Sequence, residues 1–409
     1  MRFSKKGLLF VSALGVLVTL SGCLSPIALH RAVLEYDRVA ADIQAEMLLL
    51  NVARAKHHEP LHFTAVSSVA ATFNFQLNAG WIGRLGEHPV PANQTSLTLG
   101  ASASENPTVT IIPVEGKDFT KRLLTPLNST KILFLTGQGV EPSKILRLVG
   151  HAFQDTRGPH RRLLNDPRFK DQYIEFRRIT LHLTSLALSD SIRQYSIVYE
   201  EEVPTPHLTD SPPTETTDTV IAALKAGYVW KRPVEGGAPV LTRLRESRRI
   251  VTNYDPSDLS HEQRRQLYEE VQGLPENAIF IEIRRDGPGG EYPIRGYYLF
   301  RSFLETLRRV AMGISAVPEF DVEKDPRTGP IPPQNPARAL AVQETSHEPS
   351  NALFKVQHAG SWYWIAKPPE NVPESMAWDQ TAFRMLVAMY NMTVTDISQQ
   401  PRPAITIAK

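Results

Sequence analysis

Cys23 is the only cysteine among the 409 residues of this chain. No intrachain disulfide can form, so the folded part has to be stabilised by its hydrophobic core, for which a chain of this length is ample. The cysteine follows a basic N-terminus, an uncharged apolar stretch over residues 7–20 and two small residues at 21–22. This order predicts a secretory signal peptide over residues 1–22, and the apolar stretch is too short to span a bilayer as a helix.

The four residues Leu20-Ser21-Gly22-Cys23 resemble the lipobox of bacterial lipoproteins. The resemblance implies cleavage before Cys23 and three acyl chains on the new N-terminal cysteine. Because each buried methylene contributes about 0.8 kcal/mol to membrane binding, three chains make an effectively permanent anchor. Leu24, where an aspartate would signal retention, implies the periplasmic side of the outer membrane in a Gram-negative host, or the plasma membrane in a Gram-positive one. The alternative is a plain secreted protein with an unmodified cysteine.

Removal of the leader changes the charge balance. The chain has 45 Lys and Arg against 43 Asp and Glu. Three of the basic residues, Arg2, Lys5 and Lys6, lie in the leader, which has no acidic residue, so residues 23–409 carry 42 basic and 43 acidic side chains, a net charge of −1. Nothing in this balance favours a nucleic-acid partner.

Hydrophobic periodicity predicts an α+β fold for the chain, whose first half has an N-terminal amphipathic helix, a small antiparallel sheet and a helical middle. The sheet is expected from alternating strands, with a turn at Glu105-Asn106-Pro107. The predicted elements are a helix from 27 to about 55, strands over 69–77, 95–103 and 108–114, helices over 117–124, 130–135, 142–154 and 169–189, and a strand over 192–202.

A stretch rich in Pro, Thr and Ser over 203–218 predicts a linker or loop between a region 23–202 and a mixed α+β region 219–409. The second region has no internal repeat and no βαβ regularity. Its predicted elements are helices over 219–228, 260–271, 297–312 and 381–391, strands over 240–251, 278–284 and 404–408, a turn at 287–290, a Pro-rich connection over 326–336, and a β-hairpin formed by 353–357 and 362–366.

Short segments along the mature chain resemble an uncharacterised group of Gram-negative bacterial lipoproteins. The segment Leu48-Leu49-Leu50-Asn51-Val52-Ala53-Arg54-Ala55, followed by Pro60, Phe63 and Val66-Ser67-Ser68, matches an LLLNxxRAR…P…F…VSS pattern that follows the lipidated cysteine in that group. Lys56 departs from it, since the group carries arginine there. The resemblance implies that the chain is anchored to a membrane and that its mature part forms one continuous architecture. It implies no activity.

The segment His58-Glu59-Pro60-Leu61-His62 matches the letters of the zinc-peptidase pattern H-E-x-x-H. That chemistry needs both histidines on one helical face, with the glutamate beside the metal-bound water. Pro60 has no amide donor and disfavours a helical residue before it. We therefore reject a zinc site at His58, Glu59 and His62, and no metal or other cofactor is predicted.

Trp362 and Trp364 lie two residues apart, so on a strand they share one face while Tyr363 and Ile365 share the other. One hypothesis is an aromatic platform for sugar rings or a partner protein. The other is core packing against the helix predicted over 381–391, and it is favoured because the strand is apolar on both faces.

The remaining motifs are more typical of structural elements than of catalytic or ligand-binding sites. The basic residues Arg243, Arg245, Arg248 and Arg249 suit phosphate or lipid headgroups, but a solvated face is the simpler interpretation. The glycine-rich 287–290 lacks the lysine and hydroxyl of a P-loop. No G-x-S-x-G nucleophile elbow is present.

The sequence therefore favours a lipid-anchored, non-catalytic module for interaction or envelope assembly. The expected partners at this location are envelope proteins or peptidoglycan. The alternative is a hydrolase of an envelope polymer such as peptidoglycan, whose polar groups meet only in three dimensions. A third hypothesis, assistance in transport or export, requires an apolar cavity of lipid or substrate size.

Overall fold

The computed structural model combines helices with antiparallel and mixed sheets, which confirms the predicted α+β class. Cys23, the linker residues 204–218 and the predicted strand over 404–408 lie outside the described residues. Of residues 65–82 and 96–112 only the backbone is described. The described residues are 30, 33–82, 96–137, 139–159, 161–203, 221–222, 224–231, 240–315, 317–371 and 377–394.

An N-terminal helix over 33–56 confirms the first predicted element. Its predicted apolar stripe is buried only in the second half, where Leu48, Leu49 and Val52 are inaccessible to solvent. Val33 and Val39, in the first half, are 55 % and 44 % exposed. No helix in the part of the chain that the structure describes is long and apolar enough to cross a membrane.

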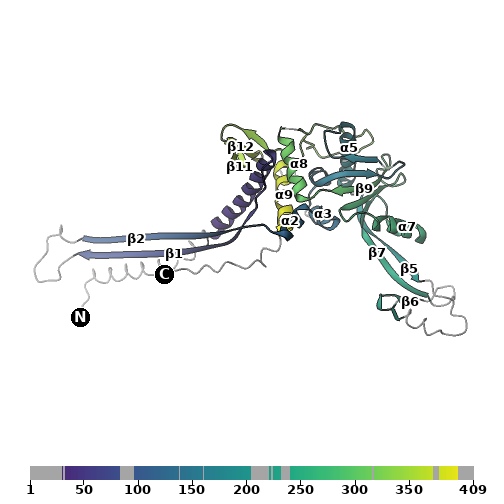
Figure 1. Cartoon of the computed structure of the whole chain (residues 1–409), viewed down its shortest axis with the longest axis horizontal. Helices are drawn as coiled ribbons and strands as arrows, with labels where there is room; N and C mark the ends of the chain where they lie inside the picture. The colour runs from purple at the N-terminus through teal and green to yellow at the C-terminus, as the bar shows by residue number, and fades with distance from the viewer. Residues whose placement is uncertain are drawn as a thin grey trace, which may run out of the picture. The chain divides into compact units, whose positions relative to one another are not determined.

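Strands β1 (Thr64–Ile82) and β2 (Ser96–Pro113) form a two-stranded antiparallel sheet, and they run side by side over their whole length (Figure 1). The predicted small antiparallel sheet is confirmed, but it has two strands instead of three, and the predicted turn at 105–107 is wrong. β2 continues through Asn106 and Pro107, which pair with Thr72 and Ala71 of β1. Local turn residues were overridden because an unbroken partner strand keeps this backbone extended.

A seven-stranded sheet has the order β4-β3-β9-β8-β7-β5, with β6 paired to β7. The strands β5 and β7 flank the predicted linker and pair directly, so one sheet contains strands from both predicted regions, 23–202 and 219–409. The strands are β3 (Gly150–Asp155), β4 (Arg161–Leu164), β5 (Arg193–Val203), β6 (Val229–Lys231), β7 (Val240–Thr252), β8 (Ala278–Ile283) and β9 (Ile294–Phe300).

The chain accordingly divides into two compact units whose limits differ from the predicted regions. The first unit consists of Met1–Asn51, Pro60–Gly116 and Val394–Lys409. The second consists of Val52–Glu59 and Lys117–Thr393, and it contains the seven-stranded sheet.

Helices of the second unit largely follow the predicted periodicity. The helix predicted over 142–154 is one of two exceptions, because it ends at Val149 and gives way to β3. A side chain at Gly150 would begin 2.3 Å from the Leu146 carbonyl, and Asn165 donates hydrogen bonds to the carbonyls of Arg147 and Gly150. The helices are α2 (Lys117–Leu124), α3 (Ser129–Thr136), α4 (Pro142–Val149), α5 (Lys170–Leu188), α7 (His261–Gln272), α8 (Phe303–Ser315) and α9 (Trp378–Val394).

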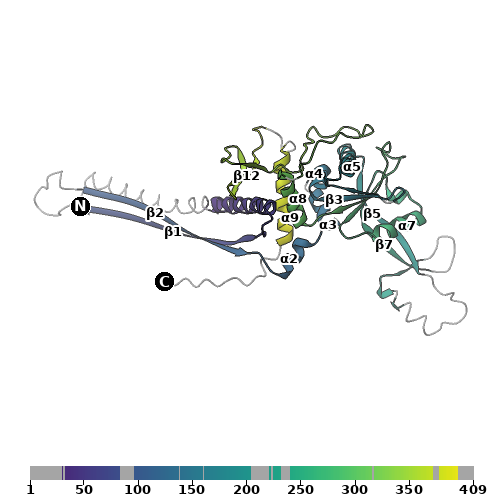
Figure 2. The same cartoon turned by 45° about the horizontal axis from the view of Figure 1, so that its top comes forward.

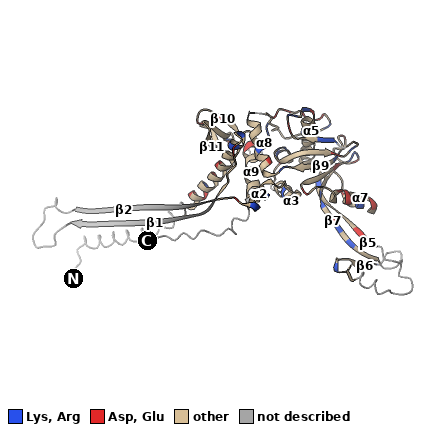
Figure 3. Ribbon diagram, in the orientation of Figure 1, with Lys and Arg blue, Asp and Glu red and all other residues tan. Residues whose placement is uncertain are grey.

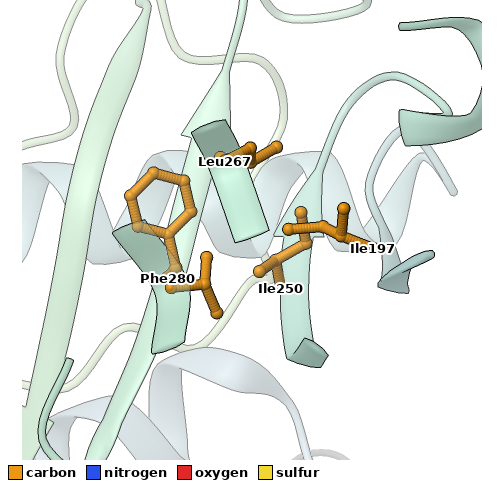
Figure 4. Packing of buried hydrophobic residues seen from close by; sticks show 5 residues of the cluster. Ile197, Ile250, Leu267 and Phe280 are labelled. Carbon is orange, nitrogen blue, oxygen red and sulfur yellow. The ribbon is translucent and has the colours of Figure 1, made fainter. Parts of the chain in front are cut away.

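The parallel pair β7 and β8 requires a crossover, and α7 supplies it. Ser260 begins α7 with a capping box to Gln263. Leu267 of α7 packs on Ile197, Ile250 and Phe280 of the sheet, and Figure 4 shows these side chains converging on one another. This cluster is the core on one face of the sheet.

On the other face, α5 lies along the sheet with α4 beside it (Figure 2). Phe176 of α5 stacks edge-on against Tyr298 of β9, with ring centroids 5.5 Å apart. β9 also corrects a prediction, since the helix expected over 297–312 is a strand up to Phe300 and a helix only from Phe303. Alternate burial along β9 keeps it extended, and Ser302 accepts a hydrogen bond from the Glu305 amide to begin α8.

A third sheet, with three strands in the order β10-β12-β11, contains the predicted hairpin, which is confirmed. Ala359 and Gly360 form its two-residue turn with φ of 47° and 82°, as a tight hairpin turn requires. Phe354 packs on Phe383 of α9 with ring centroids 5.4 Å apart. The strands are β10 (Gln343–Thr345), β11 (Ala352–His358) and β12 (Ser361–Ala366).

Candidate functional site

The H-E-x-x-H segment does not form the geometry of a zinc peptidase. The N-terminal helix ends at Lys56, and His58 takes a left-handed backbone with φ of 59°. Asn51 holds the backbone of His62 through two hydrogen bonds, of 2.8 and 2.9 Å. No group of three His, Cys, Asp or Glu suited to a metal ion occurs among the described residues. The two histidines therefore do not share a helical face.

A polar cluster lies beside this segment, which we call the Tyr363 cluster: Lys56, His57, Glu344 and Tyr363. The Tyr363 hydroxyl donates to Glu344 Oε1 at 2.8 Å and lies 2.8 Å from His57 Nε2. Lys56 Nζ donates to both carboxylate oxygens of Glu344 at 2.6 Å and to the Tyr363 hydroxyl at 3.2 Å. Nearby, Glu59 Oε2 lies 3.0 Å from His358 Nε2, within ion-pair distance.

The electrostatics of the cluster stabilise the charged ion pair. Burial lowers the pKa of Lys56, but its hydrogen bonds to Glu344 and Tyr363 outweigh this and raise the pKa above its ordinary value. The hydrogen bond from Lys56 holds the pKa of Glu344 below its usual range. Burial, together with the bond to Glu344, raises the pKa of Tyr363. The pKa values of Lys56, Glu344 and Tyr363 move away from neutrality, opposite to the tuning that general acid–base catalysis needs.

Sequence reasoning did not find the Tyr363 cluster, because Lys56 and Glu344 are 288 residues apart along the chain. The sequence signal that exists is Tyr363, a large hydroxyl-bearing side chain on the inward face of a strand, which it shares with Ser361 and Ile365. A buried tyrosine hydroxyl normally has a hydrogen-bond partner.

The tryptophan hairpin has the predicted division of faces. Tyr363 and Ile365 are inaccessible to solvent, whereas Trp362 and Trp364 lie half-buried on the opposite face. Lys355 Nζ lies 5.8 Å from the centre of the Trp362 ring. The core hypothesis fits Tyr363 and Ile365, and the aromatic platform of Trp362 and Trp364 stays a prediction.

Most arginines of the basic cluster on β7 form hydrogen bonds or ion pairs within the second unit. Arg245 donates to Glu201 of β5 at 2.6 Å, and Arg243 lies 3.5 Å from the same carboxylate. Figure 3 shows basic and acidic positions side by side on these two strands. Arg248 donates at 2.6–3.4 Å to the carbonyls of residues 271, 272, 274 and 275, which end α7 and follow it. Three of the four arginines are therefore structural, and Arg249 is exposed.

The glycine-rich segment 287–290 is a turn, as predicted. Asn253 fixes it by donating to the carbonyls of Arg284 and Pro288 at 2.9 Å and by accepting from the Arg284 amide. Gly289 has φ of 72°, and a side chain there would begin 2.1 Å from Leu186. This turn is packed against α5, and the amides of Gly287 and Gly290 donate to the carbonyls of Arg284 and Gly287.

The β1–β2 hairpin presents two sheet edges. Among the described residues β1 pairs only with β2, so each strand has one edge without a strand partner. At about 3.3 Å per residue the ribbon is roughly 60 Å long. β1 contains no Asp, Glu, Lys or Arg, and β2 contains one, Glu105. Long edges that lack charged residues are the ones prone to pair with another strand.

Comparison with known proteins adds no assignment to these sites: no protein family, no curated protein and no solved structure matches this chain.

Proposed function

We propose that this chain is a non-catalytic interaction and assembly module of the bacterial envelope, anchored through lipid on Cys23 to the periplasmic side of the outer membrane. The β1–β2 hairpin is the surface through which it joins a protein partner, by pairing one of its edges with a strand of that partner.

The main support for this proposal is the unpaired backbone along the edges of the β1–β2 hairpin. Every second residue of an edge strand turns its N–H and C=O outward, so a strand of this length offers about nine such residues. Each backbone hydrogen bond contributes about 0.5–1.5 kcal/mol net, and strand addition is an established mode of protein recognition. Most edge strands are short or charged, whereas these two are long, and Glu105 of β2 is the one charged residue in their sequences.

The Lys56–Glu344 pair of the Tyr363 cluster favours this function over the alternative, a hydrolase of an envelope polymer. Its lysine and glutamate form a close ion pair, and their pKa values are displaced away from neutrality. A general base or acid needs a pKa near the working pH.

A shortened hairpin tests the proposal. Asn74 and Ser104 are direct partners, so replacing residues 75–103 by Asn-Gly closes a tight turn and removes most of both edges. The matched control replaces only 83–95 by Asn-Gly between the partners Ile82 and Ser96, which keeps both strands complete. Pulldowns from envelope extracts should recover a protein partner with the wild-type chain and the control, and lose it with the shortened hairpin. Equal recovery by all three would refute the role of the hairpin.

The anchor is tested separately. Cys23→Ser should move the chain from the envelope fraction to the soluble fraction, and the mass of the wild-type N-terminus should include acyl chains. A Cys23→Ser chain that stays in the envelope, with no acyl mass on the wild-type chain, would refute the address and leave the hairpin experiment unaffected.

A further inference from the structure

Helices cover the α5 face of the seven-stranded sheet unevenly. A helix is about 10–12 Å wide and neighbouring strands are about 4.8 Å apart, so one helix covers roughly two strands. α5 packs on β9 through Phe176 and Tyr298. A hollow of about 560 Å³ remains over β7, β8 and β9, bounded by α5 on one side and by α3 and α4 on the other.

The floor of this hollow is apolar. Side chains that are at most 6 % exposed line it: Ile132, Ile145, Leu183, Ile279, Ile281 and Phe300. Two polar groups in the floor already have partners. Thr184 donates to the Thr180 carbonyl at 2.8 Å, and the Tyr298 hydroxyl lies 3.1 Å from Thr180 Oγ1. The floor therefore offers an occupant no free polar group.

The mouth is marked by the lining residues that solvent reaches, which include Leu188, Arg193 and Gln194. Arg193 forms an ion pair of 2.9 Å with Asp190, in which the two side chains are 64 % and 80 % exposed. Such an exposed pair contributes little to stability, so its guanidinium can exchange partners readily. Glu141, also in the lining, is 3.5 Å from Lys144 Nζ.

We propose that the hollow binds a single unbranched acyl chain, with its carboxylate at Arg193 and Gln194. Because protein interiors are otherwise close-packed, an apolar hollow of this size leaves room for a ligand. Its volume lies in the range of ligand sites, about 300–1,000 Å³. An aliphatic chain matches a floor without free polar groups, and an anionic head matches the arginine at the mouth. This site is separate from the β1–β2 hairpin and does not depend on the function proposed above.

A fluorescence titration of the full chain with cis-parinaric acid, a fatty acid that brightens in apolar surroundings, tests the site. The wild-type chain should give a saturable signal. Leu183→Trp should weaken binding at least about tenfold, because the indole takes the room of two or more methylenes. The control is Leu244→Trp, at a position of β7 that is 72 % exposed, and it should bind as the wild type does.

Two further variants cover the case of an unfolded Leu183→Trp chain and test where the carboxylate binds. If circular dichroism shows that Leu183→Trp is unfolded, Ala187→Phe at the half-buried rim replaces it, with the same expected loss of binding. Arg193→Gln should weaken the fatty acid but not the alcohol of the same chain as competitors of the probe. No saturable signal from the wild-type chain, or wild-type affinity in a folded Leu183→Trp or Ala187→Phe, would overturn the site. Equal effects of Arg193→Gln on acid and alcohol would overturn the placement of the carboxylate.

Discussion

Removing one oxygen atom, in Tyr363→Phe, should weaken the fold of the second unit. The ring of Tyr363 is inaccessible to solvent, so phenylalanine keeps its packing. What is lost is the hydroxyl that donates to Glu344 at 2.8 Å and lies 2.8 Å from His57 Nε2. A hydrogen bond to a charged group contributes about 1.5–3 kcal/mol to stability, and one between uncharged groups about 0.5–1.5 kcal/mol.

The net loss is smaller than the sum of these bonds. Phenylalanine leaves no unpaired hydroxyl in the core, and Glu344 keeps both of its bonds to Lys56. We therefore expect Tyr363→Phe to reduce the free energy of unfolding by about 1–2 kcal/mol. Domains of 150–250 residues lose about 2–4 °C in Tm per kcal/mol, so Tm should fall by several degrees.

Differential scanning calorimetry of the wild type, Tyr363→Phe and Glu344→Gln, alone and combined, measures this effect and its coupling. The double variant should lose less than the sum of the two single losses, because both remove the same bond. The pKa of Glu344 is lowered in the fold, so the stability that its charge contributes is present above its unfolded pKa and disappears as pH falls through the folded pKa. A Tm of Tyr363→Phe equal to that of the wild type at pH 7 would refute this reasoning.

Two other positions give sharp expectations. Gly296→Ala should strongly destabilise the fold, because a Cβ there would begin 2.0 Å from the Gln154 carbonyl oxygen of the neighbouring strand. A soluble variant with the wild-type Tm would contradict the register of β3 and β9. The hydrogen bond from Arg327 lowers the pKa of Asp325 to about 2, so the contribution of its charge is complete above pH 4 and is lost as pH falls through 2. Asp325→Asn should therefore have a lower Tm than the wild type at pH 7, and the two curves should converge near pH 2; a constant gap over that range would rule out the titration of Asp325 as its source.

Local sequence patterns were sufficient for most elements of this chain. The apolar spacing of the sequence predicts the helices α5 and α7, because this periodicity depends on neighbours within one or two turns. The tryptophan hairpin is equally local, since its two turn residues tolerate positive φ. The leader and Cys23 were likewise interpreted from adjacent residues alone.

Tertiary structure decided what depends on partners far along the chain. Residues 150–154 continue a helical pattern, yet β9 pairs with them and Asn165 holds the carbonyls where α4 ends. Asn106 and Pro107 suggest a turn, yet β1 keeps them extended. The Lys56–Glu344 pair and the apolar hollow arise because segments remote in sequence pack together. Hydrophobic periodicity predicts which side chains are buried, but it does not predict which segment of the chain packs against them.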